Sequence, residues 1–361
     1  MKRWFVLATA LLLPNASFAE EKVLNLYSWE AYFGAETVAK FEKETGIKVS
    51  YDLLDSNDIA ETKLLTGKSG YDLVTVNLSP HFQRQLPTGV WATLDRSRLA
   101  NLANLDRAMM ERVAAVDPGN AHSVPWMWGT TGVGYNVDKV KAIMPDAPVD
   151  SLRMVFDPEV VSKFAGCGVG MLDSGDQVLA LALIYLGLDP DTTDNGELDK
   201  AADLVAKVRP FVRKFHSSSY LNGLAEGDLC VALGFSGDML IAGNRAREAG
   251  KPYTIAYRLA KEGNLVWTDV LAMPADAPHP EAALAFIDFV MRPEIAAAAA
   301  NESGFSTANK AALPLVNETM RENANLYPSD EAQKKFHLPK ALDQKALRLW
   351  SHAWERAKGL R

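Results

Sequence analysis

The chain has 361 residues, of which 48% are hydrophobic and 23% are charged, and this composition is typical of a folded globular protein. Its formal net charge of -7 disfavours nucleic acid as a partner, because nucleic-acid binding normally requires a basic surface. A cationic small ligand fits the sign of the charge better. The length exceeds that of one ordinary hydrophobic core, so we expect two domains.

The first nineteen residues, MKRWFVLATALLLPNASFA, have the pattern of a secretory signal peptide. Lys2 and Arg3 give a basic start, an apolar segment of roughly ten residues follows, and small residues stand at Ser17 and Ala19. The apolar segment is too short to span a membrane. We therefore expect cleavage after Ala19 and export of the remaining chain to the periplasm.

Strand and helix patterns alternate after this leader. The apolar run LNLYSWEAY (24–32) predicts a strand, and a helix over 36–45, a strand over 47–53, a helix over 58–67 and a strand over 71–77 follow. This order is typical of a mostly parallel sheet with crossover helices. In such sheets ligands bind outside the carboxyl ends of the strands, which is where Trp29 and Asn77 lie.

A second alternating region, from about 132 to 257, predicts a second α/β unit. No linker rich in proline or glycine separates the two regions, so we expect the chain to cross between them more than once. A strand over 265–274, a helix over 280–293 and a docking helix over 342–357 complete the pattern. Within the second region the predicted strands are 133–137, 167–173 and 229–235, and the predicted helices are 139–144, 176–187 and 198–215.

Cys167 and Cys230 are the only cysteines. In an oxidising exported compartment a disulfide is favoured over a metal site for such a pair. The six histidines have no metal-binding spacing, and we expect neither a metal nor a cofactor.

Several long segments, in order, resemble the periplasmic polyamine-binding proteins of ABC importers, in particular the putrescine-binding type. They include NLYSWEAY, FEKETGIKVSYD, GYDLV, TTGVGYNVDKVKA, GFSGD and DVLAMPADA. The resemblance implies a type II periplasmic binding protein fold: two α/β lobes, each a mostly parallel sheet flanked by helices, joined by a multi-segment hinge. The first lobe is expected to hold residues 20–130 and 262–313, and the second lobe residues 131–261 and 314–361.

The resemblance also implies a ligand pocket, carried over position by position. Trp29 and Tyr32 match the family's aromatic pair, and Asp238 and Asp269 match acids that the family keeps. Six further positions differ from the usual residue of the family: Glu30 and Asn77 replace serines, Gln177 replaces an acid, Phe235 replaces a tryptophan, Trp267 replaces a phenylalanine and Phe305 replaces a tyrosine.

These residue types suit an alkylammonium ion, which has three donors and no acceptor and loses strong hydration on burial. Carboxylates and aromatic faces can replace that water. Asp238 and Asp269 are expected to hold one ammonium group, with Glu30 a candidate for the other. Because Gln177 offers both a donor and an acceptor, the far end could also suit a guanidinium, an acetylated amine or a carboxylate.

The resemblance therefore predicts an exported, monomeric receptor that captures a putrescine-like diamine and delivers it to an ABC permease. Agmatine, spermidine and an omega-amino compound stay open as ligands. A sensory adaptor is a further alternative. An enzyme using Asp238 and Asp269 for acid-base chemistry is disfavoured, because no nucleophile, metal motif or phosphate loop accompanies them.

Overall fold

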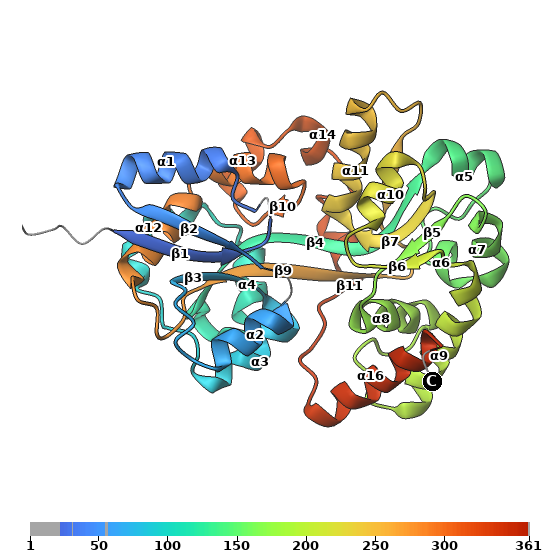
Figure 1. Ribbon diagram of the computed structural model, residues 1–361, viewed down its shortest axis with the longest axis horizontal. Helices are drawn as coiled ribbons and strands as arrows, with labels where there is room; N and C mark the ends of the chain where they lie inside the picture. Colours follow the sequence, from blue (N-terminus) through green and yellow to red (C-terminus); the bar gives the residue numbers. More distant parts are fainter. Residues whose placement is uncertain (1–21, 31, 55–56, 360–361) are drawn as a thin grey trace, which may run out of the picture.

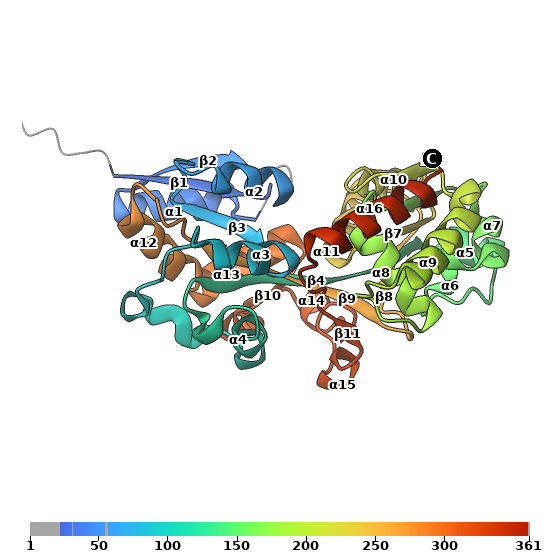
Figure 2. The same ribbon diagram turned by 90° about the horizontal axis from the view of Figure 1, so that it is seen from below.

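The computed structural model describes residues 22–30, 32–54 and 57–359. The expected signal peptide, residues 1–19, lies outside the described residues. Two α/β halves lie side by side, and two long strands, β4 (Ser123–Asn136) and β9 (Asn264–Ala272), run from one half to the other (Figures 1 and 2). This is the two-lobed α/β architecture that the sequence predicts.

The first half follows the expected order of strand and helix from its first element onward. Its α1 helix ends at Gly46, whose φ of 72° is a left-handed conformation that favours glycine. The elements of this half are β1 (Val23–Ser28), α1 (Ala35–Thr45), β2 (Lys48–Leu53), α2 (Asn57–Leu65), β3 (Leu73–Asn77), α3 (Gln83–Gln85), α4 (Arg107–Ala114), α12 (Pro280–Val290), α13 (Pro293–Ser303), β10 (Ser306–Thr307) and α14 (Glu318–Arg321).

The second half repeats the arrangement, with α10 and α11 on one side of its strands and α8 and α9 on the other (Figure 1). Its elements are α5 (Val137–Ile143), α6 (Arg153–Phe156), α7 (Pro158–Phe164), β5 (Val169–Met171), α8 (Gly175–Leu186), α9 (Asn195–Val208), β6 (Lys214–Phe215), α10 (Tyr220–Glu226), β7 (Val231–Phe235), α11 (Ser236–Glu248), β8 (Ile255–Arg258) and α16 (Gln344–Ala357). Between α14 and α16 lie α15 (Asp330–Gln333) and β11 (Phe336–His337).

One mixed sheet connects the two halves. Its strand order is β2-β1-β3-β9-β4-β7-β5-β6, with β8 and β10 also paired to β4 and β11 paired to β9. The pairs β1–β2, β1–β3, β5–β6 and β5–β7 are parallel, whereas β4 and β9 run antiparallel to each other and to their other neighbours β3 and β7. The crossing strands are therefore shared by both halves rather than appended to either.

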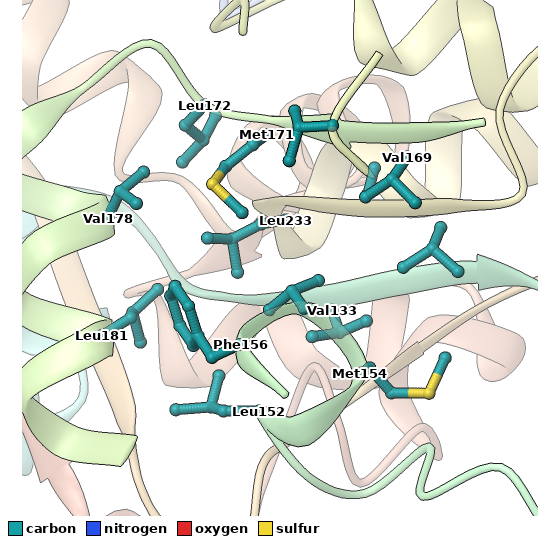
Figure 3. Close-up of a cluster of buried hydrophobic side chains, with 14 of the residues drawn as sticks. Val133, Leu152, Met154, Phe156, Val169, Met171, Leu172, Val178, Leu181 and Leu233 are labelled. Carbon is teal, nitrogen blue, oxygen red and sulfur yellow. The ribbon is translucent and has the colours of Figure 1, made fainter. Parts of the chain in front are cut away.

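Each half buries its own apolar side chains. The core of the second half includes Val133 of β4, Phe156 of α6, Leu181 of α8 and Leu233 of β7, which point toward one another in Figure 3. The docking helix predicted near the C-terminus is α16, and its Trp350 joins this core, where Trp350 Nε1 also donates a hydrogen bond to the Thr192 carbonyl oxygen.

The cores of the first half place one predicted boundary differently. Val316, Met320 and Leu326 pack with the first half, together with residues such as Phe286. The chain therefore returns to the second half after Leu326 rather than at residue 314. The sequence pattern could not locate this point, because residues 314–341 contain only short elements.

The helix predicted over 198–215 is also shorter than expected. It ends at Val208, and Lys214–Phe215 form the strand β6 beside β5. Pro210 has no backbone N–H to continue the helical hydrogen-bond pattern, which explains the break. Within the described residues, no helix combines the length and the apolar character needed to cross a membrane.

The predicted disulfide is present between Cys167 and Cys230, whose Cα atoms are 5.7 Å apart. Cys167 precedes β5 and Cys230 precedes β7, so the bond joins two segments that lead into neighbouring parallel strands. It closes a loop with a sequence separation of 63 residues.

Replacing both cysteines with serine should lower the free energy of unfolding by about 4 kcal/mol, because a closed loop of this length restricts the unfolded chain. Urea unfolding of the mature protein measures the change. Reductant should shift the unmodified protein toward the same curve and leave the double variant unchanged. Coincident curves for the oxidised protein and the double variant would show that the disulfide does not stabilise the fold.

Candidate ligand site

The carboxylate of Asp269 lies at the centre of a hydrogen-bond network in the first half. Its Oδ2 accepts from Trp29 Nε1 at 3.0 Å and from the Tyr32 hydroxyl at 2.8 Å, and its Oδ1 accepts from Asn77 Nδ2 at 3.2 Å. Trp29 and Tyr32 follow the end of β1, and Asn77, the last residue of β3, is paired with Asp269 of β9. The network therefore joins the carboxyl ends of two parallel strands to a crossing strand.

The electrostatics of Asp269 follow from its position. The side chain is buried, and burial raises the pKa of its carboxyl above the usual range, while the hydrogen bonds from Tyr32, Asn77 and Trp29 oppose that rise. Burial also raises the pKa of the Tyr32 hydroxyl, and the negative charges of Asp269 and Asp238 raise it further. The negative charges of both acids thus interact with the Tyr32 hydroxyl.

Asp238 occupies the first turn of α11 in the second half. It accepts a hydrogen bond from the Tyr220 hydroxyl, and that hydroxyl in turn accepts from the backbone N–H of Phe235 at 3.0 Å. Burial raises the pKa of the Asp238 carboxyl to about 6, and the hydrogen bond from Tyr220 and the positive charge of Arg245 oppose the rise. Tyr220 is a positioning residue that the sequence did not reveal, since nothing in the segment HSSSY connects it to Asp238.

An aromatic row runs from Tyr32, which donates to Asp269, to Phe235, whose backbone N–H donates to the hydroxyl of Tyr220. The ring centroids of Tyr32 and Phe305 are 5.9 Å apart, those of Phe305 and Trp267 are 5.0 Å apart, and those of Trp267 and Phe235 are 6.1 Å apart. The last two pairs meet edge to face, which is a favourable geometry for aromatic rings. The row combines rings from both halves and from the crossing strand β9.

Two glycines allow the rings of this row to approach the backbone. A Cβ on Gly129 would lie 2.5 Å from Cζ2 of Trp267, and a Cβ on Gly237 would clash with the ring of Phe305. Gly129 is paired with Trp267 between β4 and β9, so the indole lies flat over the neighbouring strand. Glycine is required at these positions by close packing.

The strand register places much of the site on one face of the sheet. Asp269 is opposite Asn77, Trp267 is opposite Gly129, and Thr131 is opposite Phe235. Side chains two residues apart on a strand point to the same face, so Asp269, Trp267 and Thr131 form a single line along β9 and β4. Asn77 of β3 and Phe235 of β7 lie on the same face beside this line.

Gln177 lies in the first turn of α8, beside the end of this line. Its Oε1 accepts a hydrogen bond from the Thr131 hydroxyl at 2.7 Å. Thr131 is a buried residue that the sequence analysis did not select, because a threonine in a strand is ordinarily a packing residue.

Glu30 lies apart from these contacts. Its side chain is exposed on the turn that follows β1, and it forms no hydrogen bond or ion pair with the residues that the structure describes. The other nine predicted positions are joined by the hydrogen bonds, ring contacts and strand pairings described above. A contact between Glu30 and a ligand stays a prediction.

The arrangement can stabilise a cation. Neither Asp238 nor Asp269 has a lysine or arginine partner within ion-pair distance in the described part of the chain. No group of three or more histidine, cysteine, aspartate or glutamate side chains among these residues could hold a metal ion. Two desolvated carboxylates beside four aromatic rings provide the surroundings that replace the water of an organic cation.

Comparison with known proteins gives one family and full-length relatives. Residues 36–328 match the family described as bacterial extracellular solute-binding protein. The chain is 46% identical to the putrescine-binding periplasmic protein SpuD of Pseudomonas aeruginosa, over 99% of both chains. It is 44% identical to the putrescine-binding periplasmic protein PotF of Escherichia coli, over 99% of this chain and 98% of that protein.

A solved structure agrees with these relatives. The substrate-binding protein PotD of a spermidine/putrescine ABC transporter from Streptococcus pneumoniae superposes with a TM-score of 0.78 at 25% identity. The match covers 94% of this chain and 99% of that one. The two-lobed fold is therefore shared with a solute-binding protein of known structure.

Replacing Gly129 with alanine should destabilise the protein by about 1–3 kcal/mol, because the added methyl group would overlap the indole of Trp267. Gly166→Ala is a matched control, since a Cβ there meets no atom within 4 Å. Urea unfolding of both variants gives the comparison. Equal midpoints for the two variants would mean that Trp267 does not require this close packing.

Proposed function

Because the chain belongs to the bacterial extracellular solute-binding protein family, we propose that it captures a polyamine-type cation between its two halves. Members of this family are binding proteins rather than enzymes, and the chain is a binding protein in the same sense. The proposal names a putrescine-like diamine as the ligand, with agmatine, spermidine or an omega-amino compound as related alternatives. We further propose that the loaded protein delivers this ligand to an ABC permease.

The observation that carries the proposal is the pair of desolvated acids, neither of which forms an ion pair with a lysine or arginine of the described residues. Asp238 and Asp269 both have raised pKa values because burial disfavours their charged forms. A protonated amine placed between them would supply the missing positive charge. Each charge-assisted hydrogen bond to a carboxylate contributes about 1.5–3 kcal/mol.

The aromatic row supplies the second part of the recognition. Cation-π attraction to a ring face contributes roughly 0.5–2 kcal/mol per contact, and more when water is excluded. Tyr32, Phe305 and Trp267 also cover the methylene groups that separate the nitrogens of a polyamine. A small inorganic cation has no such apolar stem, so the rings cannot stabilise it by covering methylene groups.

Capture requires residues from both halves. Asp269, Tyr32 and Asn77 belong to the first half or its shared strand, whereas Asp238 and Gln177 belong to the second. A ligand that contacts both sets favours a closed arrangement of the two halves, and differential affinity for that arrangement is what drives closure. The closed form would then be the one that a permease distinguishes from the empty form.

The remaining parts of the proposal concern location and assembly. The N-terminal pattern MKRWFVLATALLLPNASFA and the periplasmic relatives support export to the periplasm. Within the described residues, the two halves complete their cores from a single chain, which supports a monomeric receptor.

A panel of amines tests the proposal. Millimolar putrescine, cadaverine, agmatine and spermidine should raise the melting temperature, because they bind the folded protein selectively. A ligand concentration of one hundred times Kd stabilises the folded state by about 2.7 kcal/mol.

In calorimetry, Asp269→Ala should weaken amine binding by about 2 kcal/mol or more, because the ligand loses a buried carboxylate.

The controls for the panel match the ligand and the variant. Butane-1,4-diol and glutarate have similar lengths without a positive charge and should leave the melting temperature unchanged. Glu36→Ala removes an exposed acid of α1 and should keep full affinity. A shift with the uncharged or anionic compounds alone would exclude a polyamine-type ligand.

Amine affinity should fall as the pH is lowered from 7 to 5. In the ligand-free protein the pKa of Asp238 is about 6, so below this value a proton occupies the carboxylate that the cation requires. The loss approaches tenfold per pH unit for one displaced proton. Calorimetry across this range should show a shallower dependence for Asp238→Asn, and identical slopes for the variant and the unmodified protein would exclude Asp238 as the titrating group.

A further inference from the structure

The line of side chains along β4 and β9 has two chemically different ends. At one end the Tyr32 hydroxyl donates to Asp269 at 2.8 Å, and the negative charge of Asp238 also raises the pKa of Tyr32. At the other end Thr131, which is opposite Leu265 of β9, donates to Gln177. Leu265 is four residues from Asp269, so the two ends are about 13 Å apart along the strand at ~3.3 Å per residue.

The end at Gln177 presents a hydrogen-bond donor. Because the amide oxygen of Gln177 is taken up by the Thr131 hydroxyl, the side of the amide that remains is its NH₂ group. This group has no partner among the described residues, and the side chain is half-buried. A ligand atom that approaches Gln177 therefore meets N–H donors rather than an acceptor.

Trp267 adds a second donor between the two ends. The residue is 8% exposed, and its indole Nε1 has no hydrogen-bond partner within the described part of the chain. A buried N–H left without an acceptor costs about 1–3 kcal/mol. Its place in the row between Phe305 and Phe235 makes a bound ligand the available source of an acceptor.

We propose that the preferred ligand carries a single ammonium group at one end and a neutral carbonyl oxygen at the other, as a mono-N-acylated diamine does. This inference rests on the proposed capture of an amine at the same site. The ammonium lies between Asp238 and Asp269, and the carbonyl oxygen accepts from the Gln177 amide. Trp29, Tyr32, Asn77 and Tyr220 stabilise the negative charge that a single cation leaves in excess.

The other end groups fit these donors less well. A second ammonium or a guanidinium has only donors, so its N–H groups would face those of Gln177 and Trp267. A carboxylate can accept from both, but it would bring a third negative charge to a face that already holds Asp238 and Asp269. A carbonyl oxygen satisfies the donors without that repulsion.

Calorimetry with the mature protein tests the inference through three probes. N-acetylputrescine has the ammonium and the carbonyl oxygen, putrescine has two ammonium groups, and heptylamine has one ammonium and a chain of similar length without an acceptor. N-acetylputrescine should bind at least about tenfold more tightly than either of the others, the factor expected when a buried donor finds its acceptor.

Two variants separate the role of each donor. Gln177→Glu should reverse the order, so that putrescine binds more tightly than N-acetylputrescine, because an acid replaces the amide donor. Trp267→Phe keeps an aromatic ring and removes the N–H, and it should weaken the binding of N-acetylputrescine more than the binding of heptylamine. A merely structural role for Trp267 would change both ligands alike.

The outcomes distinguish this inference from the proposed function. Putrescine binding as tightly as N-acetylputrescine, or more tightly, in the unmodified protein would overturn the inference and leave polyamine capture intact. No binding of any of the three amines would overturn the proposed function itself. Both outcomes are measured on the unmodified protein, so neither requires that a variant folds.

Discussion

A carboxylate that has left water needs compensation, and Asp269 receives it from three neutral donors instead of a cation. This requirement fixes the positions of Trp29, Tyr32 and Asn77, which come from the ends of two parallel strands. Three of the roughly four lone-pair positions of the carboxylate are occupied. The remaining acceptor capacity faces a site that, in the described residues, offers it no lysine or arginine. In the proposed receptor, this wall presents its carboxylate before the ligand arrives, so little reorganisation is needed there.

The second constraint is the continuity of the sheet. Because β4 and β9 pair with strands of both halves, their side chains can contact the first half and the second half alike. Trp267 and Asp269 are two residues apart on β9, yet one packs against Phe235 of the second half and the other accepts from residues of the first. Under the proposed closure, Asp238 and Gln177 of the second half approach the Asp269 network, whereas that network stays together through its own hydrogen bonds. The proposed site therefore has one side held together by the Asp269 network and one side, with Asp238 and Gln177, that moves toward it.

Much of the fold could be predicted from sequence, because its evidence is local. Alternation, glycine stops and the spacing of apolar residues indicated two α/β units, and Cys167 and Cys230 form the expected disulfide. Asp269 was recognisable because a charge within the apolar run LVWTDVLAMP requires a reason. One error was local, because the apolar pattern continued past Pro210, which cannot extend the helix. The other depended on non-local contacts, because short elements near Leu326 hid the return of the chain.

The finer features of the site were beyond sequence for the same reason. The exposure of Glu30 depends on the turn after β1, and the partnership of Tyr220 with Asp238 joins α10 to α11 through space. The orientation of the Gln177 amide depends on Thr131, which is 46 residues away. A residue type at a pocket position indicates which groups are present, but the hydrogen bonds of its neighbours decide which group faces a ligand.

The line of side chains on β4 and β9 also limits how such a receptor can diverge. Side chains on one face of a strand recur only every second residue, about 6.6 Å apart. A mutation therefore cannot shift the position of an acid on this face by a distance as small as one methylene group. Adaptation to a slightly longer or shorter ligand must instead come from replacing one side chain with another at a fixed strand position. Descendants of one ancestral scaffold would then differ in chemistry at a few shared positions while their backbones stay nearly superimposable.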